Sequence, residues 1–134
     1  MDKTSDRYDI SKDVLFAAQE KIDVTAVAAA QTPWWNRTLT EVNDAVVRLG
    51  VLDGDFHWHQ HENEDEFFYV VEGRLLIDLI DPQDPATTED NPRTIDLGPR
   101  QGVVIPKGVM HRPRAPQRTV MLMVETDTIR PTGS

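Results

Sequence analysis

The chain beyond Asn43 is a succession of short apolar runs, and this pattern limits its fold more than any other feature of the sequence. The runs are rich in Val, Ile, Leu and Phe, and Gly, Pro or Asp separates one run from the next. None has helical periodicity, so each predicts a β-strand. Closely spaced short strands predict an all-β sandwich, jelly roll or barrel. The predicted strands cover residues 45–52, 56–61, 66–72, 74–80, 94–97, 102–105 and 119–125.

The part of the chain before these runs has a different character. Residues 12–21 carry apolar side chains at helical spacing behind Ser11, which can cap a first turn, so a short helix is predicted there. Residues 24–32 are mainly Ala, Val and Thr, and Pro33 ends any continuing helix, so they are expected to form a connector. The two residues that follow are expected to pack on the outside or the mouth of the β domain: Trp34 and Trp35.

The length of 134 residues favours one domain with a single core. We expect three parts, namely a helix with its connector at 1–40, an all-β domain at 41–128 and a C-terminal tail at 129–134. Residues 81–93 hold three prolines and four acids, so they are predicted to form an exposed loop between two strands.

Composition excludes several classes of protein and site. The chain has no Cys, so it can form no disulfide and no thiolate site, and any metal must be held by imidazole and carboxylate. Fourteen basic and 23 acidic residues give a net charge of -9, which argues against nucleic acid as a partner. No stretch approaches the roughly 18 apolar residues of a membrane span, and the first ten residues lack a secretory core. We therefore expect a soluble, cytoplasmic protein.

Potential metal ligands concentrate in a short segment of the predicted sheet. In a strand, His57, His59 and His61 would project from the same face about 6.6 to 7 Å apart, so two of them can meet one ion. A turn of charged residues then reverses the chain and brings Glu66 to the same place. His111 follows a second turn, and the set becomes three imidazoles and one carboxylate.

Two spaced motifs in this region are typical of a known family: His59-x-His61-x4-Glu66-x6-Gly73 and Pro106-x-Gly108-x2-His111. They resemble the two signature motifs of the cupin superfamily, and the resemblance covers about residues 45–125. It implies a double-stranded β-helix, which is a small jelly-roll barrel. It also implies that four residues coordinate one divalent metal inside the barrel mouth: His59, His61, Glu66 and His111. The first motif looks most like the small single-domain cupins.

Other residues are candidates for the pocket around this site. The motif does not require His57, which is either a catalytic residue that supports the ligands from behind or an exposed residue at the start of its strand. Phe68 shares the parity of Glu66 and is expected to be core or a wall of the substrate pocket. Met121 and Met123 lie in a strand that is apolar on both faces, so one face is expected to line the barrel. The N-terminal segment or a second subunit is expected to cover the other face.

Four arginines near the predicted strand ends could each anchor an anionic group of a substrate or simply balance local acids, and the second interpretation is preferred for each singly: Arg48, Arg74, Arg112 and Arg114. The acidic turn at 62–65 is predicted to be solvated rather than a second carboxylate site.

The ligand set admits iron, manganese, nickel, cobalt or zinc, because imidazole and carboxylate together do not select among these ions. The favoured hypothesis is a metal-dependent enzyme with dioxygenase, isomerase or lyase chemistry. Its substrate would be a small oxygen-rich organic molecule, such as a keto acid, an enol, a sugar derivative or a polyketide-like compound. The alternative is a non-catalytic module or sensor that binds a small molecule in the same pocket. A homodimer is expected, because a strand that is apolar on both faces needs its outer face covered.

Overall fold

The computed structural model describes residues 8–133, so the first seven residues of the predicted N-terminal part and Ser134 lie outside it. The described chain forms eight strands and one short helix. In chain order these are β1 (Asp9–Val14), α1 (Val24–Ala29), β2 (Trp35–Val42), β3 (Ala45–Asp55), β4 (Glu66–Glu72), β5 (Leu75–Ile80), β6 (Arg93–Leu97), β7 (Gly102–Ile105) and β8 (Met110–Thr126). The all-β prediction is confirmed. No helix in residues 8–133 is long and apolar enough to cross a membrane.

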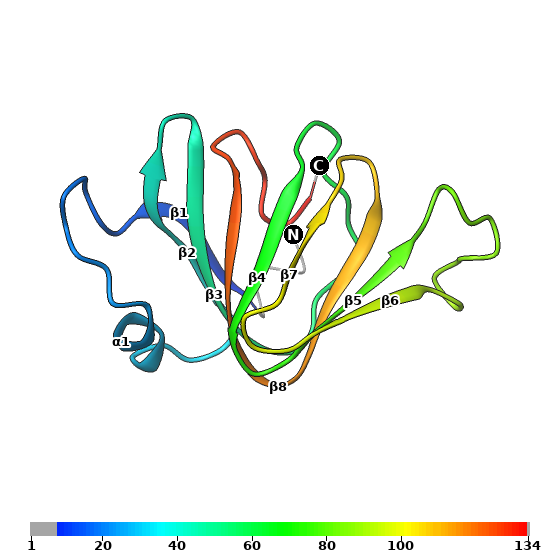
Figure 1. The fold of residues 1–134 in the computed structure, drawn as a ribbon, viewed down its shortest axis with the longest axis horizontal. Helices are drawn as coiled ribbons and strands as arrows, with labels where there is room; N and C mark the ends of the chain where they lie inside the picture. Colours follow the sequence, from blue (N-terminus) through cyan, green and yellow to red (C-terminus); the bar gives the residue numbers. More distant parts are fainter. Residues whose placement is uncertain (1–7, 134) are drawn as a thin grey trace.

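One long strand organises the sheet. The strand order is β1-β2-β3-β8-β4-β7, and β5 joins through β8 with β6 beyond it, so the sheet remains open. β8 pairs first with β5 and then, after a bend, with β3 and β4. Figure 1 shows the two halves as the walls of a V, with the orange β8 turning at its base. This is the predicted jelly-roll fold, and the space between the walls is its interior.

The bend in β8 has a visible cause in its register. Leu52 of β3 faces Thr119, whereas Gly54 faces Ala115, so β8 holds extra residues at this point. Such a bulge bends the strand that carries it and increases its twist. Pro116 lies in the extra stretch and cannot donate a ladder hydrogen bond, which favours the break in pairing there.

Alternation along β8 builds a separate apolar cluster on each side of the sheet. Met121 and Met123 point into the interior cluster, whereas Val120 belongs to an outer cluster that includes Ala28 of α1. The N-terminal segment therefore covers part of the outer face, which was one of the two predicted coverings. The remaining buried members of the interior cluster are Leu52, Phe68, Val70, Leu75, Ile77, Leu79, Leu97, Ile105 and Ala115.

The predicted helix over 12–21 is wrong. Residues 9–14 form β1, which pairs in parallel with β2, and the helix instead occupies 24–29, within the predicted connector. Asp23 caps this helix, because its side chain accepts a hydrogen bond of 3.1 Å from the Ala26 N–H. Backbone pairing with β2 has overridden the helical spacing of the earlier segment.

β2 was not predicted, because its polar side chains point into the sheet interior and its apolar ones point outward, the reverse of an ordinary half-buried strand. Trp35 and Leu39 face the outer cluster, whereas Asn36 and Thr38 lie on the opposite face. β2 also crosses residue 40, where the N-terminal part was expected to end, and the division of the chain into parts stays a prediction. All but one of the predicted strands are present, and the loop after β5 is confirmed up to β6.

A glycine substitution tests the tight turn that ends β4. Gly73 has a φ of 91°, and a Cβ there would lie 2.5 Å from the Thr119 hydroxyl and 2.7 Å from the Arg118 carbonyl oxygen. Gly54 has a similar φ of 93° with nothing within 4 Å of its Cβ position. Both Gly→Ala changes add backbone strain of about 1 to 3 kcal/mol. Gly73→Ala adds overpacking of about 1 to 3 kcal/mol, so urea unfolding should show the larger loss there. Equal losses at the two positions would contradict the close approach.

Candidate metal centre

The segment that carries the histidines is extended but is not the predicted strand over 56–61. Phe56 N–H donates to the Pro113 carbonyl at 2.9 Å, and His59 forms a single bridge with His111 in β8. The ladder cannot continue between these points, because Pro113 has no N–H to return a hydrogen bond. The bridge nevertheless holds His59 beside His111 through two backbone hydrogen bonds of 3.0 and 2.9 Å.

Three separate segments bring the four predicted ligands together. Their ligand atoms all lie within 4.8 Å of one another, and all four residues are buried: His59, His61, Glu66 and His111. Glu66 opens β4, and its Oε1 lies 3.4 Å from His61 Nε2 and 3.5 Å from His111 Nε2. The clustering that the motif spacing implied is therefore present in the fold.

Backbone carbonyls orient two of the imidazoles. His59 Nδ1 donates to the His57 carbonyl at 3.0 Å, and His111 Nδ1 donates to the Val109 carbonyl at 2.9 Å. With Nδ1 protonated in both rings, the neutral Nε2 atoms are left as acceptors. This is the usual arrangement behind a metal-binding histidine.

Several ligand atoms of the four-residue cluster have no hydrogen bond. Within residues 8–133, neither ring nitrogen of His61 has a hydrogen-bond partner, nor does His111 Nε2 or Glu66 Oε1. Buried polar atoms in proteins are almost always paired, so several unpaired ones at one point require an explanation. Of the eight unpaired buried side-chain atoms in the described residues, four belong to these ligands. Three imidazoles and a carboxylate are a donor set that suits a divalent transition ion, and the residues therefore fit one.

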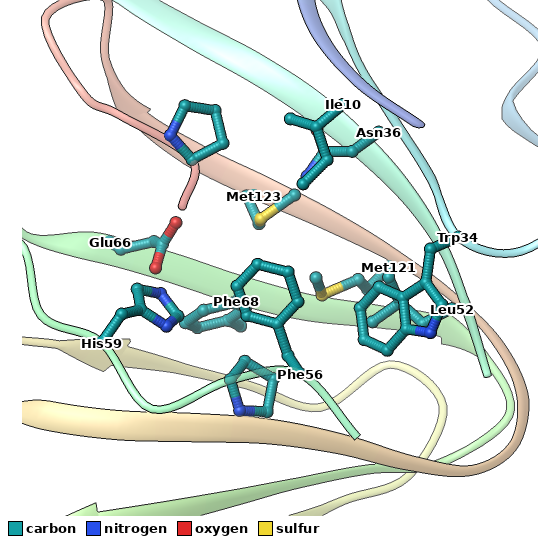
Figure 2. Close-up of a pocket in the computed structure, with 12 residues that line it drawn as sticks. Ile10, Trp34, Asn36, Leu52, Phe56, His59, Glu66, Phe68, Met121 and Met123 are labelled. Carbon is teal, nitrogen blue, oxygen red and sulfur yellow. The ribbon is translucent and has the colours of Figure 1, made fainter. Parts of the chain in front are cut away.

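A narrow hollow leads to this cluster. The empty space within it is about 350 Å³, which includes open solvent at its mouth. Figure 2 shows His59 and Glu66 at one end, with aromatic and sulfur-containing side chains along the rest. Phe68, Met121 and Met123, the predicted pocket residues, all line it.

Comparison with known proteins agrees with this geometry. Residues 45–126 match the family model for the cupin domain. The chain belongs to the cupin family. It is 43% identical over 90 residues to the uncharacterized protein YdbB of Bacillus subtilis (strain 168), an alignment that covers 67% of this chain and 71% of YdbB.

Solved structures share the fold of this cupin. A cupin-2 domain-containing protein from Shewanella frigidimarina superposes with a TM-score of 0.67 at 31% identity, covering 78% of this chain and 93% of that one. Hydroquinone 1,2-dioxygenase from Sphingomonas sp. TTNP3, solved with 4-hydroxybenzoate bound, superposes with a TM-score of 0.64 at 19% identity. That alignment covers 84% of this chain and 77% of the dioxygenase, and at this identity the likeness concerns the fold alone.

Burial sets the protonation of the cluster in this cupin. Burial, with a smaller contribution from the charge of His111, lowers the pKa of His59 to about 3. Burial would raise the pKa of Glu66, but the close approach of Glu125, His111 and His61 holds it well below its usual value. Near neutral pH, His59 is therefore neutral and Glu66 is ionised, which are the forms in which each can bind a cation.

Glu125 is a site residue that the sequence analysis missed. Burial and the negative charge of Glu66 raise the pKa of Glu125 well above its usual value, so the two carboxyls share one proton. Arg48, which is fully buried, lies 3.4 Å from the Glu125 carboxylate and balances the single negative charge of the pair. The available signal was parity, because Glu125 alternates in phase with Met121 and Met123.

The segment predicted as a C-terminal tail packs against the site as far as Gly133, the last residue that the structure describes. Ile129 is completely buried, and Pro131 lines the hollow. His57 Nε2 donates to the Thr132 carbonyl at 2.7 Å. The Gly133 backbone lies so close to His59 that a Cβ on Gly133 would approach the His59 Cβ to 2.8 Å.

His57 does not join the four-residue cluster. Its ring packs at a tilt on Phe56, with 4.2 Å between the ring centroids, and its backbone carbonyl rather than its side chain holds His59. Trp34 lines the hollow and donates to the Asp53 carbonyl at 2.6 Å, whereas Trp35 is in the outer cluster. The two tryptophans therefore have different surroundings, one at the pocket and the other outside.

Besides Arg48, the three arginines singled out in the sequence have local carboxylate partners, which is the interpretation that the sequence analysis preferred. Arg74 pairs with Asp96 at the surface at 2.6 Å. Arg112 and Arg114 both bind Asp78, at 2.9 and 2.6 Å. None of the three lines the hollow.

The low pKa of His59 gives a pH dependence of stability for the metal-free protein. The ring takes up its proton near pH 6.5 in the unfolded chain and near pH 3 in the folded one, so stability is lost as pH falls from about 6.5 towards 3. Between pH 7 and pH 5 this group alone contributes a loss of about 2 kcal/mol. In urea unfolding, His59→Gln should reduce the loss between these two pH values by that amount. An unchanged loss in the variant would contradict a buried neutral His59.

Proposed function

We propose that this cupin is a metal-dependent enzyme in which His59, His61, Glu66 and His111 hold one divalent transition ion. The observation that carries the proposal is the convergence of unpaired ligand atoms at one buried point. A structural role alone gives no reason to leave such atoms without hydrogen bonds, since an apolar core of the same volume is less costly.

The residues around the ion have distinct tasks. Glu66 supplies the negative charge of the site, and the backbone carbonyls behind His59 and His111 keep those rings in place. The apolar hollow positions a small molecule beside the ligands and limits the access of water. A bound ion would supply Lewis-acid chemistry and, if it were iron, a site for dioxygen, which suits dioxygenase, isomerase or lyase reactions.

Metal analysis tests the proposal. The purified protein, loaded separately with iron, manganese, nickel, cobalt or zinc, should retain about one ion per chain with at least one of them, by elemental analysis. His61→Ala and His111→Ala should lose the ion, whereas His57→Ala, the matched control beside the cluster, should keep it. The loaded protein should also melt above the chelator-treated one, because the ion binds only the folded chain; the gain is about 2.7 kcal/mol at 100 times Kd.

Two outcomes separate the proposal from its alternatives. Equal metal content in the His61→Ala, His111→Ala and unaltered proteins would contradict the ligand set. Stoichiometric metal that never supports turnover would favour the non-catalytic binding module.

A second copy of the chain is the proposed partner of the outer sheet face. Val104 and Val124 are 52% and 39% exposed, and both lie directly opposite Phe67 in the register. Val47 extends this apolar row on β3, where it faces Val124. β7 ends the strand order, so its free edge can meet the same edge of a second copy in a two-fold arrangement.

Light scattering on two matched variants tests the dimer. The unaltered protein should have the mass of a dimer at micromolar concentration. Val104→Lys should give the monomer mass, because the new charge would be buried against the partner. Val14→Lys changes a residue that is 45% exposed on β1, at the opposite end of the strand order, and should remain dimeric. A monomeric unaltered protein would overturn the proposal.

A further inference from the structure

The wall of the hollow is almost entirely apolar. Apart from Asn36, His59 and Glu66, its residues are hydrophobic: Ile10, Trp34, Leu52, Phe56, Phe68, Pro113, Met121, Met123 and Pro131. Ring faces and thioether sulfurs form favourable contacts with the body of an aromatic or unsaturated molecule. The same apolar side chains provide no hydrogen-bond or ionic partner for a hydroxyl or a charged group that loses its hydration there.

No cation is available to a ligand along this wall. Among the lining residues that the structure describes there is neither lysine nor arginine. Arg48 is the buried guanidinium of the interior, and it donates to the Thr38 hydroxyl at 2.8 Å and to the Ser11 carbonyl at 3.0 Å. Its Nε side faces Glu125 at 3.4 Å, and Arg48 does not line the hollow. A carboxylate on the body of a substrate would be buried without a partner.

The polar side chains that line the hollow are concentrated at one end. Figure 2 shows His59 and Glu66 at one end, Trp34 and Leu52 at the other, and Phe68 between them. Asn36 is the remaining polar group, and its side-chain oxygen already accepts a hydrogen bond from Arg48. Among the lining residues that the structure describes, a ligand oxygen therefore finds polar side chains at the end where the metal ligands lie and, beyond it, only the amide of Asn36.

We infer that the substrate is a small phenol or enol whose remaining body is uncharged and apolar, an inference that rests on the proposed function. A phenol has a pKa near 10, so it passes the apolar wall uncharged, whereas a carboxylic acid is ionised at neutral pH and loses its hydration. A bound divalent ion would supply positive charge at the ligand end of the hollow, where a phenol or enol oxygen can meet it. Sugar derivatives and molecules with a distant carboxylate are excluded.

A matched pair of ligands tests the inference on the cobalt-loaded protein. 4-Methylphenol and 4-hydroxybenzoate share the ring and the hydroxyl and differ only in the group at the far end. Titration followed by the visible absorption of cobalt should give at least tenfold weaker binding for 4-hydroxybenzoate. Comparable or tighter binding of 4-hydroxybenzoate, or no binding of 4-methylphenol up to 10 mM, would overturn the inference.

Two methionine variants on β8 locate the binding site. Met123→Ala removes part of the wall and should weaken 4-methylphenol binding about tenfold. Met110→Ala is the matched control, because Met110 does not line the hollow, and it should leave the affinity unchanged. Equal effects of the two changes would place the ligand elsewhere and overturn the inference.

Elemental analysis of each sample separates the two proposals. A protein that binds no cobalt or other ion fails as a metalloenzyme, and the inference fails with it. A protein that binds one cobalt but prefers 4-hydroxybenzoate retains the proposed function and loses only the inference on the substrate. The comparison of the two ligands uses the unaltered protein, so it does not depend on the folding of either variant.

Discussion

Taking four titratable side chains out of water at one point is the constraint on which this structure depends. Their ligand atoms lie within 4.8 Å of one another, and an unpaired buried polar atom is costly. The fold meets this constraint by fixing each group through backbone geometry: the bridge to β8 holds His59 beside His111, and the start of β4 supplies Glu66. β8 carries His111 at one end and Met123 at the other, so a single bent strand joins the ligands to the wall of the hollow.

A second polar group inside the sheet explains the unusual composition of its N-terminal edge. Arg48 and Glu125 are both fully inside, and a buried guanidinium must find acceptors for its donors. Thr38 and Asn36 on β2 provide two of them, which is why the inward face of that strand is polar. Polar groups thus extend from the N-terminal strands through Arg48 and Glu125 to Glu66.

The sequence predicted the all-β class and the metal cluster because both rest on local spacing. Alternating apolar runs mark strands whatever their partners are, and the two motifs fix which ligands follow each turn. β2 escaped prediction because its inward residues serve Arg48, a partner ten or more residues away. Glu125 and Pro131 were missed for the same reason, since only the folded chain brings them to Glu66 and to the hollow. The strand predicted over 56–61 was wrong because Pro113, on a distant segment, interrupts its ladder.

The arrangement of charge inside the sheet has a consequence for selectivity. The positive charge of Arg48 compensates the negative charge of the Glu66–Glu125 pair, so this buried cation does not contact a ligand in the hollow. If Arg48 instead faced the hollow, an anionic ligand could bind there without any contribution from a metal, and the apolar wall would no longer discriminate. Because Arg48 is withdrawn and the described lining residues include no lysine or arginine, a bound ion would be the source of positive charge in the hollow. Recognition then rests on two separate requirements. The bound molecule needs an oxygen donor at the end of the hollow where the metal ligands lie, and the rest of it must have a small desolvation penalty.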